Sequence, residues 1–224
     1  MPKYVNPPRL DPGALAGMID PNRGFLCMTS HWRPDPKAAD PEMPGQKLSM
    51  SSYIPLSGRK ACLCGSGKRY RDCCQQSPSW HPVCPNPGGL DRGYSLIKPQ
   101  QATFRSLDGG VIRERLMTAR QLRCTDANPV SSFWVFFGDP PVEDQYGILC
   151  FGDIELKHNR TLVLSAMSDL RMQRLLALLS EIAGDVVGQP QMSHDPVAVI
   201  DKATGKMRQI QSTKPRPGRR QRKR

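Results

Sequence analysis

The residues best suited to chemistry are four cysteines within thirteen positions of the chain: Cys62, Cys64, Cys73 and Cys74. They form one C-x-C pair and one adjacent pair, with eight residues between the pairs. Four thiolates are a common ligand set for a single tetrahedral Zn²⁺ ion. Because all four ligands would come from the protein, no coordination position would remain for water. We therefore expect a structural zinc site rather than a catalytic one.

Two alternatives to this ligand set stay open. Cys73 and Cys74 are neighbours, and if both cannot bind one ion, Cys84 or His81 downstream could take the fourth position. The thiols could also be unliganded, or the adjacent pair could form a disulfide bond. The sequence shows no apolar leader and no apolar stretch of about 18 residues, so we expect a cytoplasmic protein without a transmembrane segment. Clustered thiols in a reducing compartment favour metal over disulfides.

The residues between the cysteine pairs fit a metal-binding loop. Gly65 and Gly67 supply the backbone freedom that is needed to wrap amide groups around sulfur. The cations of Lys68, Arg69 and Arg71 would favour deprotonated thiols and offset the negative charge of a zinc ion with four thiolates. Tyr70 is expected either to cover the site or to pack against a neighbouring strand.

This segment, CLCGSGKRYRDCC at residues 62–74, resembles the SEC-C motif, a small zinc module known from the C-terminal end of the SecA preprotein translocase ATPase. The family pattern is C-x-C, then Gly-Ser-Gly-Lys and an aromatic residue, then Cys-Cys or Cys-His. The resemblance implies zinc bound by the four cysteines and a role in binding protein partners or ribosomes. In this chain the module is internal rather than terminal.

The positive charge is concentrated at the C-terminal end. Ten basic residues and no acidic one follow Asp201, so residues 1–201 carry only +2 of the net charge of +12. Residues 201–224 are predicted to be a disordered basic tail, because the charge run contains proline and glycine. Residues 214–224 could bind RNA through phosphate contacts, together with Lys60, Lys68, Arg69 and Arg71 of the cysteine segment.

The predicted fold class is α+β, with five segments along the chain. Ten of the 22 prolines fall in residues 1–57, which we expect to form an extended arm. A zinc module over 58–84 and a linker over 85–93 follow. Residues 94–200 are predicted to form a two-layer domain of antiparallel strands with one amphipathic helix, and 201–224 is the tail. The expected strands cover 131–137, 146–156 with a bend near Gly152, and 161–164, with a further candidate at 101–107. The expected helix covers Asp169–Ala183 with Ser168 as its N-cap. Residues 111–123 suit either a helix or a strand.

The leading hypothesis is a non-enzymatic zinc-binding adaptor that binds RNA, the ribosome or a protein partner. A second hypothesis is an enzyme whose active site lies in residues 94–196, with Asp153, Glu155 or His158 in a deep pocket. A secretion or chaperone adaptor is the third. Three further cysteines, Cys27, Cys124 and Cys150, are predicted to be buried structural thiols.

Overall fold

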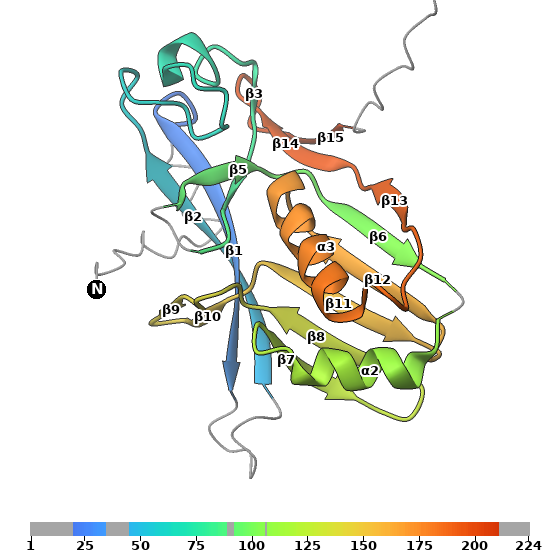
Figure 1. Cartoon of the computed structure of the whole chain (residues 1–224). Helices are drawn as coiled ribbons and strands as arrows, with labels where there is room; N and C mark the ends of the chain where they lie inside the picture. The colour runs from blue at the N-terminus through green and yellow to red at the C-terminus, as the bar shows by residue number, and fades with distance from the viewer. Residues whose placement is uncertain (1–19, 35–44, 89–91, 106, 211–224) are drawn as a thin grey trace, which may run out of the picture.

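The computed structural model describes residues 20–34, 45–88, 92–105 and 107–210 (Figure 1). Within them, the chain forms three β-sheets and two α-helices. The first sheet has the strand order β5-β4-β1-β10-β9, and β2 pairs with β1. Its strands are β1 (Gly24–Pro34), β2 (Gly45–Pro55), β4 (Val83–Pro85), β5 (Tyr94–Leu96), β9 (Glu143–Asp144) and β10 (Gly147–Leu149).

The long hairpin of β1 and β2 contradicts the expected extended arm. The two strands pair in antiparallel register over eleven residues each, from Gly24 opposite Pro55 to Pro34 opposite Gly45. The prediction was wrong because proline density was averaged over residues 1–57. The prolines among the residues described here stand beside or at the ends of the strands, and 24–33 and 45–54 contain none. Residues 1–19 and 35–44 of the predicted arm lie outside the described part.

The second sheet has the order β13-β6-β12-β11-β8-β7 and carries the main core. Its strands are β6 (Gln100–Phe104), β7 (Leu122–Ala127), β8 (Ser132–Phe136), β11 (Gly152–Lys157), β12 (Thr161–Ala166) and β13 (Gln191–His194). Two helices, α2 (Gly109–Thr118) and α3 (Asp169–Ala183), cover one face of it (Figure 1). Strand β12 shows the expected alternation, because Leu162, Leu164 and Ala166 are buried beneath α3 and the residues between them are half-buried.

Most of the predicted α+β layer is confirmed, with two corrections. Helix α3 has the predicted bounds, and the Ser168 side chain accepts a hydrogen bond from the Arg171 amide as its N-cap. The segment 111–123 contains both a helix and the start of a strand, because α2 ends at Thr118 and β7 begins at Leu122. The predicted domain therefore has two helices rather than one. The predicted strand 146–156 is two strands, because Cys150 and Phe151 connect β10 in the first sheet to β11 in the second.

The third sheet is small and has the order β15-β14-β3. It joins β3 (Ser79–Trp80) to a C-terminal hairpin of β14 (Val197–Asp201) and β15 (Met207–Ile210). Residues 201–210 therefore belong to an ordered hairpin and not to a disordered tail, which is a further correction. The apolar run Val197–Ile200 in β14 and the turn at Gly205 supply the local signal. The rest of the predicted tail, residues 211–224, lies outside the described part.

Arg171 of α3 connects the second sheet to the first. Its side chain is 1% exposed and donates hydrogen bonds to the carbonyl oxygens of Pro85 and Cys150, with Nη2–O and Nη1–O distances of 2.6 and 3.4 Å. The guanidinium also lies over the Phe151 ring, 5.1 Å from its centroid. The helix of the second sheet is thereby connected to strand β4 of the first. No helix in the described ranges is long and apolar enough to cross a membrane.

Candidate metal centre

The loop that carries the cysteines is built on a short stretch of β-like pairing. The Tyr70 amide donates to the carbonyl oxygen of Lys60, and the Cys62 amide donates to that of Lys68. The N–O distance is 2.8 Å in both hydrogen bonds. Between these bonds the chain reverses direction at Gly65 and Gly67, whose φ angles of 78° and 73° lie in the left-handed region. The predicted role of the two glycines in this turn is thus visible in the backbone.

The second cysteine pair follows a single turn of 3₁₀-helix, η1 (Tyr70–Asp72). The Cys73 amide donates to the carbonyl oxygen of Tyr70 at 3.1 Å, which folds Cys73 and Cys74 back toward the first pair. This turn brings Cys64 and Cys73, which are nine positions apart in sequence, to the same side of the loop.

All four sulfur atoms, from Cys62, Cys64, Cys73 and Cys74, lie within 4.8 Å of one another. The Sγ atoms of Cys64 and Cys73 are 3.5 Å apart, and those of Cys73 and Cys74 are 3.9 Å apart. In a tetrahedral site with Zn–S bonds of about 2.3 Å, the sulfur atoms are about 3.8 Å apart. The donor set therefore fits one tetrahedral ion in both chemistry and spacing. The adjacent residues Cys73 and Cys74 each place a sulfur atom in this cluster.

The thiols influence one another strongly. Burial and the neighbouring Cys62 and Cys64 raise the pKa of Cys74. Burial also acts to raise the pKa of Cys64, but hydrogen bonds from Ser66 and the neighbouring thiols outweigh it and lower that pKa to about 7. A thiolate thus forms easily at Cys64 and opposes the ionisation of Cys62 and Cys74. A bound divalent cation removes this conflict, because its charge stabilises several thiolates together.

Tyr70 anchors the module to the first sheet. Its side chain is 1% exposed, its ring packs on Phe25 of β1 with a centroid distance of 5.3 Å, and its hydroxyl donates to the carbonyl oxygen of Gly24 at 3.0 Å. Of the two predicted positions, Tyr70 therefore takes the one against a neighbouring strand. Trp80 donates to the same Gly24 oxygen through Nε1 at 2.9 Å.

The alternative ligands lie in other surroundings. Cys84 is fully buried in β4, and burial raises the pKa of its thiol. His81 precedes β4 and is half-buried, and burial lowers the pKa of its imidazole. Within the part of the chain described here, the group of residues that could hold an ion consists of the four cysteines alone.

The other cysteines are not part of this group. Cys27 and Cys150 are buried as expected, and burial raises the pKa of each to about 12, which keeps them protonated and unreactive. Cys124 departs from the expectation because it is only half-buried.

The predicted basic surface is present on the module. Lys60, Lys68, Arg69 and Arg71 are all exposed, and so is Arg59, which the sequence analysis did not single out. Lys202 was also missed. Its ammonium donates to the carbonyl oxygens of Cys74 and Gln75 at 2.9 and 2.8 Å, although it lies 128 residues from Cys74. Nothing local in the sequence signals this contact.

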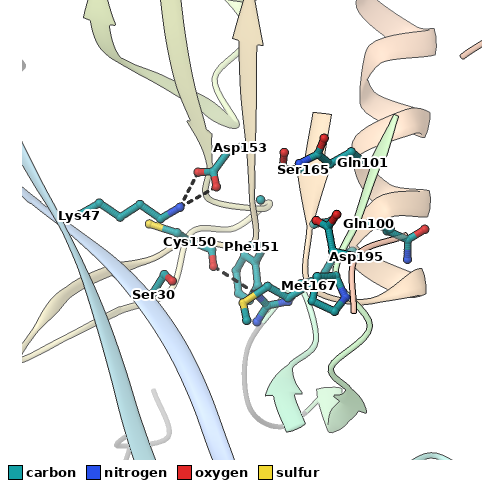
Figure 2. Close-up of a pocket in the computed structure, with 14 residues that line it drawn as sticks. Ser30, Lys47, Gln100, Gln101, Cys150, Phe151, Asp153, Ser165, Met167 and Asp195 are labelled. Carbon is teal, nitrogen blue, oxygen red and sulfur yellow. Dashed lines mark hydrogen bonds and ion pairs between the residues drawn. The ribbon is translucent and has the colours of Figure 1, made fainter. Parts of the chain in front are cut away.

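The residues named for the enzyme hypothesis do not share a site. Asp153 lines a cavity of about 150 Å³, where it accepts two hydrogen bonds from Lys47 at 2.7 and 2.6 Å (Figure 2). Ser165 and Gln101 lie on the opposite side of that cavity (Figure 2). Glu155 forms an ion pair with Lys157 at 3.1 Å, and His158 is exposed in the turn between β11 and β12. Lys47 neutralises Asp153, the one residue of the three that lines the cavity.

Comparison with known proteins singles out the same segment as the geometry. No curated protein and no solved structure matches the chain significantly. The family model of the SEC-C motif matches residues 57–76, a range that holds the four cysteines, the two glycines and Tyr70. Residues 57–76 of this chain are therefore a SEC-C motif whose four cysteines form a cluster compatible with metal binding.

Proposed function

We propose that the chain is a zinc-binding interaction protein in which Cys62, Cys64, Cys73 and Cys74 hold one structural Zn²⁺ ion. The observation that carries the proposal is the convergence of the four sulfur atoms within 4.8 Å inside a SEC-C motif. When bound, the ion supplies a cross-link between the two ends of the loop. Four protein ligands fill a tetrahedral zinc and leave it no position for a substrate.

The chain's own residues prepare the site and present its surface. Gly65 and Gly67 turn the loop, and Tyr70 fixes it on β1. Within residues 57–76 five side chains are basic and one, Asp72, is acidic. The module thus stays positively charged even after the two negative charges of a zinc–tetrathiolate centre are counted. We infer that this face binds a polyanion in the cytoplasm, most simply the phosphate backbone of RNA or of the ribosome, with residues 214–224 adding affinity.

Metal content tests the zinc site. The purified, untagged protein should contain one zinc per chain by inductively coupled plasma mass spectrometry, and removal of the ion by a chelator should expose four additional titratable thiols. The variants Cys64→Ser and Cys73→Ser should lose the metal, because a serine hydroxyl is a poor zinc ligand at neutral pH. Cys124→Ser is the matched control and should retain it, since Cys124 is half-buried outside the cluster. A protein that contains no zinc, or iron in its place, would contradict the proposal.

A further inference from the structure

The metal centre is in contact with the C-terminal hairpin through a single lysine. The ammonium of Lys202 donates to the carbonyl oxygens of Cys74 and Gln75, at 2.9 and 2.8 Å. Its backbone amide donates to the carbonyl oxygen of Pro78 at 3.0 Å. Lys202 follows directly after β14, so one residue of the hairpin is bonded at three points to the chain that leaves the second cysteine pair.

The strand pairing next to Lys202 strengthens this connection. Ile200 of β14 lies opposite Trp80 of β3, and Asp201 lies opposite Ser79. Trp80 is 6% exposed and is itself bonded to Gly24 of β1. The segment from Cys74 to Trp80 is therefore bonded to the C-terminal hairpin and, through Trp80, to the first sheet.

The position of the ammonium suits a site that holds a metal. Its two acceptors lie in the turn that carries Cys73 and Cys74, so Lys202 holds the backbone of one ligand residue, Cys74, and of the residue that follows it. A zinc ion with four thiolates carries two negative charges, and a cation on the carbonyl oxygen of a ligand residue offsets part of them. Lys206 and Arg208 lie in the same hairpin but are exposed, and Arg208 pairs with Asp201 at 2.8 Å.

We propose that Lys202 is a positioning residue for the metal centre and couples it to the β14–β15 hairpin, so that metal binding and hairpin docking stabilise each other. This proposal rests on the proposed zinc site. Coupling of this kind is reciprocal. If the docked Lys202 raises the affinity for the ion, the bound ion must stabilise the docked hairpin by the same factor.

The first test measures zinc affinity by competition with a chromophoric chelator. Lys202→Met retains the aliphatic stem and removes the ammonium, and we expect it to lower the affinity by ten- to a hundredfold, the usual effect of losing a residue that supports a metal ligand. Lys202→Arg keeps the charge and the donors and should restore most of the affinity. Lys206→Met, a matched change on the same hairpin, should stay within about twofold of wild type.

The second test uses the wild-type chain and does not depend on how the variants fold. Removal of zinc should increase amide hydrogen exchange at Val197–Asp201, while Thr161–Ala166 in the second sheet should keep its protection. Unchanged affinity in Lys202→Met, or unchanged exchange at Val197–Asp201, would overturn the coupling and leave the zinc site intact. A wild-type protein that binds no zinc would instead refute the proposed function.

Discussion

At the scale of single residues, two aromatic side chains converge on one carbonyl oxygen. Tyr70 and Trp80 both donate to the oxygen of Gly24, and the Tyr70 hydroxyl also lies 3.3 Å from the oxygen of Pro21. A buried hydroxyl must be hydrogen-bonded to be tolerated, so this bond fixes the orientation of Tyr70 as well as its depth. The contact joins Tyr70, which lies between the two cysteine pairs, to strand β1.

Tyr70→Phe should therefore destabilise the protein modestly. The change keeps the ring packing on Phe25 and removes the hydroxyl. Trp80 still donates its hydrogen bond to the carbonyl oxygen of Gly24. We expect a loss of about 1 kcal/mol in the free energy of unfolding, the usual net value of one hydrogen bond. Urea denaturation of the zinc-loaded protein measures this value.

Tyr53→Phe supplies the control. The Tyr53 hydroxyl donates to the carbonyl oxygen of Asp20 at 3.2 Å, but this side chain is only half-buried and water can replace the lost bond. Its free energy of unfolding should change by less than about 0.5 kcal/mol. Equal losses in the two variants would show that the buried hydroxyl of Tyr70 has no special role.

The cysteine cluster and Lys202 show what the sequence predicts at this scale. The cysteines, the two glycines and the nearby cations all lie in the thirteen residues 62–74, so the sequence alone predicts the cluster. Lys202 is brought to Cys74 by strand pairing between β14 and β3, which is a long-range contact. Only the folded chain reveals such a partner.

At the scale of elements, prediction was accurate wherever the signal was local. Helix α3 was predicted correctly because its cap, its apolar face and its terminal glycine are all encoded within seventeen consecutive residues. Strands β1 and β2 were missed because the prolines around them hid two proline-free runs. A bend near Gly152 was expected, but the division of 146–156 between two sheets was missed, because the pairing of β10 with β1 and of β11 with β8 is long-range.

Ser168→Ala tests the cap that these local signals predict. Ser168 is 1% exposed and its hydroxyl accepts a hydrogen bond from the Arg171 amide at 3.4 Å. Its removal leaves a helix amide without its partner where water cannot reach it, so we expect a loss of about 1 to 2 kcal/mol in the free energy of unfolding. Thermal or urea denaturation gives the value.

Ser180→Ala is the matched change inside the same helix. Ser180 is exposed in α3, and alanine has the higher helix propensity, so its effect should be zero or slightly stabilising. A Ser168→Ala protein as stable as wild type would mean that the hydroxyl does not cap α3.

At the scale of the whole molecule, the positive charge is concentrated in the cysteine module and in the C-terminal segment. Residues 1–201 carry +2, whereas the basic side chains of the module are exposed and seven more cations lie in residues 214–224. Strand β15, which ends at Ile210, belongs to the hairpin that Lys202 bonds to the module. The basic segment, residues 214–224, therefore follows in sequence a hairpin that is bonded to the basic module at residues 57–76.

If the basic segment binds the phosphates of RNA, replacement of the seven cations in 214–224 by glutamine should weaken binding at low salt and reduce its salt dependence. Each phosphate contact on single-stranded RNA adds about 0.7 to the slope of log K against log salt, so the slope should fall by up to about five. Fluorescence anisotropy with a labelled RNA at several salt concentrations measures both quantities, and the substitution keeps the length of the chain unchanged. Because charge neutralisation is independent of base sequence, the loss should be similar for unrelated RNAs. Binding that is equal with and without the seven charges would remove RNA as the partner of this segment and favour a protein partner for the module.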